Sequence, residues 1–196
     1  MGEVKGKDIA TLVSEIDTNL IRAGLLAGGL SDEQFNWSPE PGRWSIAQNL
    51  VHLNIIKAQD MNALRTAIDK GRSQNVTGNG PFQYGFLSRK FVGSMEPPVT
   101  RKFKSPGYYQ PPPDAKLDHT LSEYRKLSGE VRDLAVSASG LDLARVKTKL
   151  SALPALVQMI ITMPLGARLE LLTAHDRRHF AQAEQVKTHA KFPALK

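Results

Sequence analysis

The 196-residue chain contains no cysteine. This absence excludes disulfide bonds, zinc–thiolate sites and cysteine nucleophiles, so any metal site must use nitrogen and oxygen ligands. No run approaches the ~18 consecutive apolar residues that a membrane-spanning helix needs. The N-terminal stretch MGEVKGKDIA also lacks the apolar core of a secretory signal. We therefore expect a cytoplasmic protein with no membrane partner.

Much of the net positive charge is concentrated in one segment, residues 72–113. The net charge is +7, and residues 72–113 hold six basic residues against one acid, Glu96. The excess therefore belongs to an irregular segment and not to a helix face, and solvated loop charge explains it better than phosphate binding. With no recognition helix or RNA-binding aromatic motif in view, we expect no nucleic-acid partner.

What is present is typical of an ordinary globular protein, with 41% hydrophobic and 23% charged residues. We expect a single domain over residues 1–196. Apolar residues recur at steps of three and four in four stretches, which predicts four long helices. Their expected ranges are 8–29, 45–70, 114–137 and 165–189. Ser45 and Gln48 form a capping box at the start of the second helix.

Two connections depart from this periodicity. Residues 72–113 hold seven of the twelve prolines and seven aromatic residues, which predicts an ordered crossover lying over one end or side of the helices, with a short helical turn at 82–92. The stretch SALPALVQMIITMPLG predicts short helical pieces or a turn. The expected fold class is all-α, a four-helix bundle with a long crossover connection between helices 2 and 3.

Two histidines interrupt the apolar stripe of the fourth helix. His175 and His179 stand one turn apart in HDRRHFAQ, on the face that the leucines of this helix share. Gln182 lies on the same face, whereas Asp176 and its neighbours are expected to point elsewhere. Such a pair can hold one divalent ion, but it also arises by chance, and a buried histidine can be satisfied by a backbone carbonyl.

A third histidine strengthens the metal interpretation. His52 lies at the edge of the stripe of the second helix, and its helical neighbours include the polar Asn49, which suits a cavity lining. If the second and fourth helices are neighbours, His52 completes a three-histidine set. Three neutral imidazoles leave at least one coordination position open, which is typical of catalytic metal sites. The two other histidines, His119 and His189, are expected at the surface.

Two blocks of the sequence resemble the DinB-like superfamily. LSDEQFNWSPEPGRWSIAQNLVHL, residues 30–53, resembles the turn and helix that carry the family's first metal histidine. GARLELLTAHDRRHFAQAEQV, residues 166–186, resembles its last helix, with the pattern His-x-x-x-His-x-x-Gln. Together the blocks cover about 45 residues, and the order and spacing of the predicted helices agree over the remainder.

This resemblance implies a four-helix bundle with a divalent metal ion, zinc or nickel, held by three histidines. By position these are His52, His175 and His179. The family's glutamine corresponds to Gln182, which we interpret, with Asn49, as a residue that orients a ligand or lines the pocket. Characterised relatives are largely thiol-dependent transferases, which implies a low-molecular-weight thiol as cosubstrate. The long segment 72–113 departs from the family pattern, so the substrate does not carry over.

Three functions remain open. The leading one is a metal-dependent enzyme that transfers a thiol to a small electrophilic substrate, since a metal can lower the pKa of a thiol. A metal-dependent hydrolase is the second, although neither Asp60 nor Glu170 is well placed as its base. The third is a non-catalytic bundle that binds metal or a small ligand. A homodimer is compatible with any of them, and no catalytic residue is assigned.

The other conspicuous side chains are expected to serve the fold. Trp44, just ahead of the N-cap, is interpreted as a hydrophobic staple or as a plug at the end of the bundle. Tyrosines in the crossover, Tyr84, Tyr108 and Tyr109, are expected to pack within it more than to reach a pocket. Arg177 and Arg178 are expected on a solvated helix face.

Overall fold

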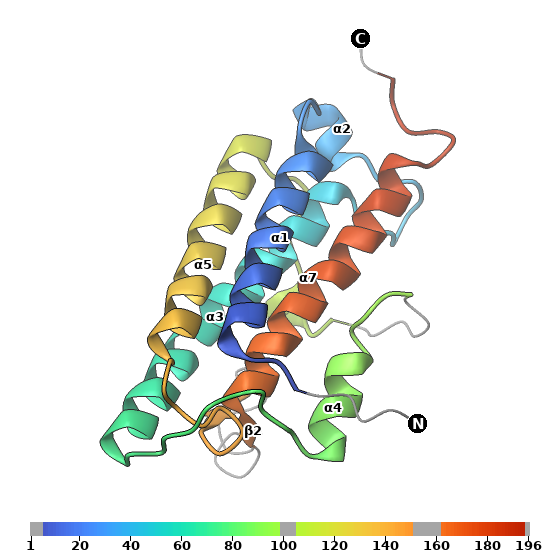
Figure 1. The fold of residues 1–196 in the computed structure, drawn as a ribbon. Coiled ribbons are helices and arrows are strands. Elements are labelled where there is room, and N and C mark those ends of the chain that lie inside the picture. The colour runs from blue at the N-terminus through green and yellow to red at the C-terminus, as the bar shows by residue number, and fades with distance from the viewer. Residues whose placement is uncertain (1–5, 99–104, 151–161, 195–196) are drawn as a thin grey trace.

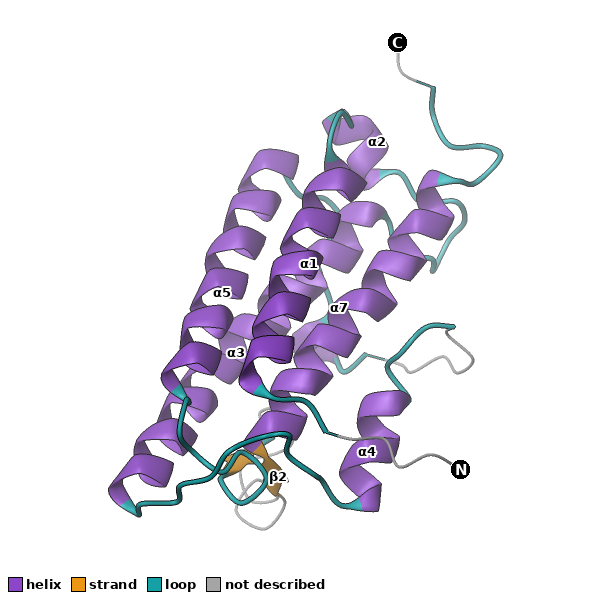
Figure 2. Cartoon of the chain, in the orientation of Figure 1, coloured by secondary structure: helices purple, strands orange, loops and turns teal. Residues whose placement is uncertain are grey.

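The structure is a computed structural model that describes residues 6–98, 105–150 and 162–194. Long helices dominate it, and the strands are confined to one small sheet (Figures 1 and 2). None of the helices that the structure describes is long and apolar enough to cross a membrane.

Four long helices form the body of the molecule, which confirms the all-α prediction. They are α1 (Ile9–Ala27), α3 (Ile46–Ser73), α5 (Leu117–Ser137) and α7 (Leu165–Lys187). Helix α3 packs against α5 and α7, and α1 packs against the same two helices, so the four helices surround a common core (Figure 1). The second and fourth long helices, α3 and α7, are therefore neighbours.

The helix starts follow from capping side chains. Ser45 accepts a hydrogen bond from the backbone N–H of Gln48, whose side chain accepts one from the Ser45 N–H, so the predicted capping box begins α3. Asp8 caps α1 by accepting from the backbone N–H of Thr11 at 2.8 Å. A second capping box, of Ser31 and Gln34, starts the short helix α2 (Asp32–Asn36), where the sequence predicted only a turn.

The long connection between α3 and α5 contains two short helical pieces. These are α4 (Phe86–Gly93), close to the predicted turn at 82–92, and the 3₁₀ helix η1 (Gly107–Tyr109). Helix α4 packs against the outer side of α7 (Figure 1). The crossover prediction is therefore right in position, and α7 is covered on a side that a four-helix bundle alone would leave exposed.

The connection before α7 differs from the prediction where it is described. Strands β1 (Lys147–Lys149) and β2 (Thr162–Pro164) pair antiparallel, with Thr148 opposite Met163. The expected short helical pieces fall largely on residues 151–161, which lie outside the described residues. A strand pair was missed because each strand is only three residues long, too short for a period-two pattern to show.

A layer of buried polar side chains divides the core. One apolar cluster contains Leu64 and Leu169, and the other contains Leu50 and Phe180. Between them, each long helix contributes one polar side chain to what we term the polar layer. These side chains are Asn19 of α1, Lys57 of α3, Tyr124 of α5 and Asp176 of α7. The site histidines of α3 and α7 lie at this same level of the two helices.

Candidate metal centre

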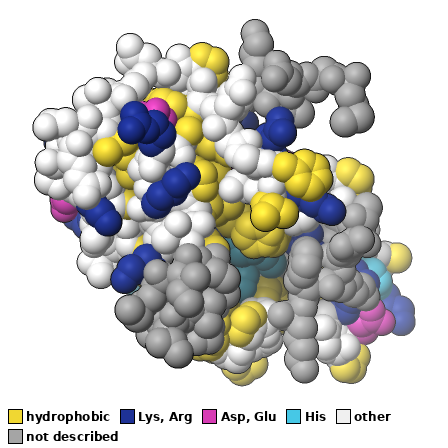
Figure 3. Space-filling model, turned by 90° about the horizontal axis from the view of Figure 1, so that it is seen from below, with side chains coloured by type: hydrophobic (Ala, Val, Ile, Leu, Met, Phe, Trp, Pro, Cys, Tyr) yellow, Lys and Arg dark blue, Asp and Glu magenta, His cyan; other side chains and the backbone are white. Residues whose placement is uncertain are grey.

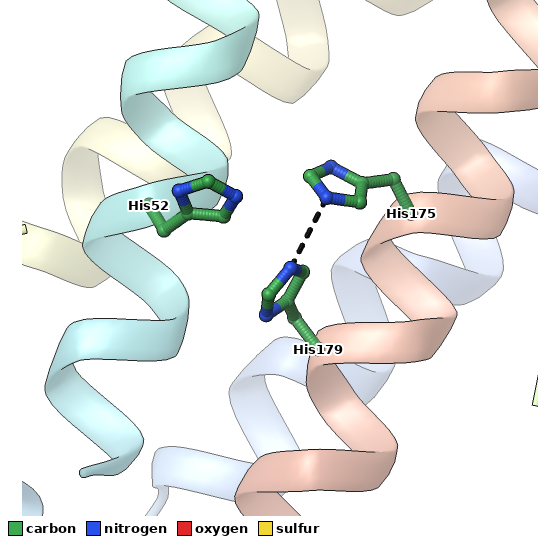
Figure 4. A group of neighbouring side chains, drawn as sticks. All are labelled: His52, His175 and His179. Carbon is green, nitrogen blue, oxygen red and sulfur yellow. Dashed lines mark hydrogen bonds between the residues drawn. The ribbon is translucent and has the colours of Figure 1, made fainter. Parts of the chain in front are cut away.

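Three histidines meet between α3 and α7. His52 projects from α3, and His175 and His179 project from α7 toward it (Figure 4). Each ring offers one nitrogen, and these nitrogens all lie within 4.8 Å of one another. The arrangement depends on two features of the sequence: the one-turn spacing on α7, and the packing of α7 against α3.

The orientation of His52 is fixed by the backbone of η1. Its Nδ1 lies 2.8 Å from the carbonyl oxygen of Tyr109. A carbonyl oxygen can only accept, so Nδ1 carries the hydrogen and donates it. Nε2 of His52 is then left with its lone pair. The crossover segment therefore sets the tautomer of a histidine on α3.

His179 is fixed in the same way by a side chain of α3. Its Nδ1 lies 2.8 Å from Oδ1 of Asn49. The amide nitrogen of Asn49 donates to the carbonyl oxygen of Ser45 at 2.8 Å, which identifies the other end of the amide as the oxygen. His179 therefore donates from Nδ1 and keeps its Nε2 lone pair. Asn49, which the sequence singled out as a cavity residue, orients a histidine of the opposite helix.

The two histidines of α7 face each other through nitrogen atoms. Nε2 of His179 lies 3.1 Å from Nε2 of His175 (Figure 4). Since the His179 atom holds a lone pair, this short approach needs either a shared proton or a cation at the same point. The donor set of three imidazole nitrogens fits a divalent ion of borderline softness such as zinc or nickel.

Burial keeps the three imidazoles neutral. Desolvation lowers the pKa of His52, and it lowers the pKa values of His175 and His179 further below the ordinary histidine value, with a contribution from the neighbouring site histidines. Neutral imidazole is the form that binds a metal. At neutral pH the site therefore presents lone pairs and no repelling charges.

The histidines form one wall of a cavity of about 1000 Å³. From one side, histidine side chains are visible at the floor of a hollow, with hydrophobic side chains beside them (Figure 3). Gln182, the other residue singled out from the sequence, also lines this cavity. Three histidines on one wall and open space in front of them provide room for a ligand beside a bound ion.

Trp44 belongs to this cavity, contrary to its interpretation as a plug at the bundle end. Its ring centroid lies 4.9 Å from that of His52 and 5.7 Å from that of His179, with the latter ring stacked at 24°. The turn before it contains Gly42 at φ 82°, a conformation that favours glycine. The tryptophan thus covers the histidines from the side where α3 begins.

The cavity carries positive charge. Its lining includes three arginines, Arg43, Arg168 and Arg178, and no acidic side chain among the residues that the structure describes. The prediction that Arg178 lies on a solvated face is wrong: it is 4% exposed and donates to the carbonyl oxygen of Ser94, just after α4.

Asp176 is another residue of α7 whose burial the sequence did not indicate. It is 4% exposed and pairs with the ammonium of Lys57, which is itself 3% exposed. The Tyr124 hydroxyl donates to its Oδ2 at 2.8 Å, and the Asn19 amide approaches the same oxygen at 3.5 Å. Directly behind His175 the bundle thus contains a charged pair that neither the apolar stripe nor the histidine motif indicated.

The remaining candidates divide between cavity and core. Tyr109 lines the cavity, and burial raises its pKa to about 12. Tyr84 is buried, while Tyr108 is exposed. Neither Asp60 nor Glu170 is among the residues that line the cavity: Asp60 pairs with Arg168, and Glu170 accepts from the backbone N–H of Lys7 at 3.2 Å. His119 and His189 are exposed, as the sequence predicted.

The fold and the histidine cluster define an all-α bundle with a candidate three-histidine metal centre. A family model for the DinB superfamily matches residues 22–183, a range that includes both histidine-bearing helices. The chain belongs to the DinB superfamily. No curated protein and no solved structure matches it. A three-histidine cluster in this family is compatible with a bound divalent metal.

Proposed function

We propose that the protein is a metal-dependent enzyme that transfers a low-molecular-weight thiol to a small electrophilic substrate. The observation that carries the proposal is the convergence of three neutral imidazoles on one wall of a cavity. In this proposal His52, His175 and His179 hold zinc or nickel through their Nε2 atoms. A divalent ion held there would lower the pKa of a bound thiol, which would then be present as thiolate at neutral pH.

The chain's own residues have defined tasks in this reaction. Tyr109, through its carbonyl oxygen, and Asn49, through its amide oxygen, hold two ligand rings in the tautomer that keeps Nε2 available. Trp44 covers these rings on one side. The apolar side chains of Ile56, Leu171 and Leu172 line the cavity and limit the access of water to the reacting atoms, which favours attack by sulfur over hydrolysis.

The transfer itself is balanced without any oxidant or reductant. The thiol loses its proton to solvent on binding. The sulfur then uses an electron pair to form a bond to an electrophilic carbon of the second substrate. The bond from this carbon to its leaving group breaks, and the leaving group departs with the bonding pair.

The lining of the cavity favours thiol transfer over the hydrolase alternative. Hydrolysis needs a group that takes the proton from the attacking water, most often a histidine or a carboxylate, and in this proposal the three histidines of the cavity are metal ligands. None of the described residues that line the cavity is acidic. A thiol has a much lower pKa than water, so it needs no such base.

Metal content is the first test. After purification without a nickel column, the wild type should contain one zinc or nickel ion per chain. His175→Ala should lose most of it, and His119→Ala, which removes an exposed histidine, should retain it. A metal-free wild type would overturn the proposal and leave a bundle with no metal chemistry.

Thiol binding is the second test. The protein loaded with Co²⁺ should develop a sulfur-to-cobalt absorption band in the near ultraviolet when 2-mercaptoethanol is added at pH 7. His175→Ala, treated in the same way, should show no band. If the wild type binds cobalt but gives no band with millimolar thiol, the thiol-dependent reaction is wrong.

A further inference from the structure

A buried arginine lies in the cavity beyond the histidines. Arg168 is 6% exposed and lines the cavity, and its Nη2 pairs with the carboxylate of Asp60 on α3. Its Nε is buried and has no hydrogen-bond partner among the residues that the structure describes. A buried donor without a partner is costly, and turning the side chain to meet a ligand that accepts a hydrogen bond would remove this cost.

The wall between this arginine and the histidines is apolar. Leu171 and Leu172 line the cavity between Arg168 and His175 on α7, and Ile56 lines it from α3. Arg168 and His175 are seven residues apart in one helix, so their Cα atoms are separated by about 10 Å along its axis. The cavity therefore has a metal-binding part at the histidines and a cationic end at Arg168, with an apolar stretch between them.

The charge of the lining favours an anion at the cationic end. Elsewhere in the lining, Arg43 before α3 and Arg178, three residues after His175, add two more guanidinium groups, and no described lining residue is acidic. Asp60, which pairs with Arg168, is not among the lining residues, so Arg168 and not Asp60 borders the cavity. An ammonium group on a ligand would face the positively charged residue of the pair there.

We infer that the thiol bound at the histidines carries an anionic group, such as a carboxylate, which Arg168 binds about two helical turns from the sulfur. This inference rests on the proposed function, and it adds the substrate class: an anionic thiol with an apolar spacer. Arg168 would determine specificity by accepting the anionic end and rejecting a neutral or cationic one.

Matched thiols test the inference on the Co²⁺-loaded wild type. The probes are 6-mercaptohexanoate, 6-mercaptohexanol and 6-aminohexanethiol, whose chains are equal in length and close to the required span. The absorption titration should show the carboxylate binding at least tenfold more tightly than the alcohol, since a hydrogen bond to a charged group is the gain, and the amine should bind most weakly. With the short pair 3-mercaptopropionate and 2-mercaptoethanol, which cannot span the distance, the preference should fall below threefold.

Variants assign the preference to the arginine. Arg168→Gln alone would remove the arginine that pairs with the buried Asp60 carboxylate, so the test uses Asp60→Asn/Arg168→Gln, which removes both charges. It should bind the alcohol as the wild type does and lose the tenfold preference for the carboxylate. Arg132→Gln, which removes an arginine of α5 paired with Asp17 away from the cavity, should retain the preference.

The outcomes separate this inference from the proposed function. Equal affinity for the three long thiols, or a preference that survives in the double variant, would overturn the anionic-thiol inference while the thiol chemistry stands. Absence of the sulfur-to-cobalt band with every thiol would overturn both. A preference of equal size in the short and long pairs would overturn the role of Arg168 and indicate general attraction of anions.

Discussion

Replacement of Lys57 by methionine should destabilise the protein severely. The ammonium group is 3% exposed, pairs with Asp176 and lies 4.3 Å from the centroid of the Tyr124 ring. Methionine fills similar space without the charge. The Asp176 carboxylate would then stay buried with only the Tyr124 hydroxyl and the Asn19 amide as partners, and removal of one member of a buried ion pair costs about 3–5 kcal/mol.

The loss in the free energy of unfolding can be measured by urea unfolding followed by circular dichroism, with EDTA present so that metal binding does not contribute. A loss of about 3–5 kcal/mol corresponds to a decrease in melting temperature of about 6–20 °C for a chain of this size. The double variant Lys57→Met/Asp176→Asn removes both charges and should recover at least half of the loss. With the other single variant, Asp176→Asn, measured as well, the double-mutant cycle gives the coupling energy of the pair.

Two results would refute this reasoning. One is a loss below about 1 kcal/mol for Lys57→Met, which would mean that water or relaxation solvates the carboxylate. The other is a double variant that is less stable than the single one, since the charges would then not be coupled. Lys126→Met serves as the control, because this lysine of α5 is 64% exposed in its side chain and its loss should change stability by under about 0.5 kcal/mol.

The remaining predictions concern the surroundings of the histidines. Asn49→Leu removes the hydrogen-bond acceptor of the His179 ring, so the zinc affinity measured by chelator competition should fall about 10- to 100-fold. The control Asn62→Leu, on the exposed side of α3, should not change this affinity. Equal zinc affinities of Asn49→Leu and the wild type would show that the amide is not needed. Cu²⁺ should quench the fluorescence of Trp44, which contacts two of the site rings, so quenching should persist in Trp37→Phe and disappear in Trp44→Phe. Burial lowers the pKa of all three histidines, so the unfolded metal-free chain takes up protons first as the pH falls. The free energy of unfolding should be constant above about pH 6.5 and decrease below it, by at most about 1.4 kcal/mol per pH unit for each histidine. His175→Gln should reduce this slope, and an unchanged slope would contradict the conclusion that burial of His175 causes it.

The sequence was sufficient for the features that local patterns determine. The capping box at Ser45 predicted the start of α3, and the apolar stripes predicted the four long helices within a few residues. The proximity of His52 to the histidines of α7 followed from the spacing on one helix and from the assumption that the two helices are neighbours. These features depend on residues close in sequence or on one simple packing rule.

The errors concern the outer faces of α7. Arg178 was placed on a solvated face, and the burial of Asp176 was not foreseen, because the leucine stripe marks only one face of the helix. In the structure α1, α3 and α4 all pack against α7, and α4 comes from the irregular crossover, whose path no periodicity predicts. Arg178 is buried where the chain leaves α4, and it donates to the backbone carbonyl oxygen of Ser94. Tyr109 likewise contacts His52 through its backbone carbonyl group, which every residue type possesses. Backbone contacts of this kind leave no trace in residue identity.

The polar layer also decides how the helices can align. If α7 slid by one turn along α3, Leu172 or Phe180 would replace Asp176 opposite the Lys57 ammonium, and a buried charge would face hydrocarbon. Shifted arrangements that leave the leucine contacts nearly intact are therefore strongly disfavoured. Because His175 immediately precedes Asp176 in the chain, the same ion pair that selects the alignment of the helices also determines the height at which the imidazoles meet.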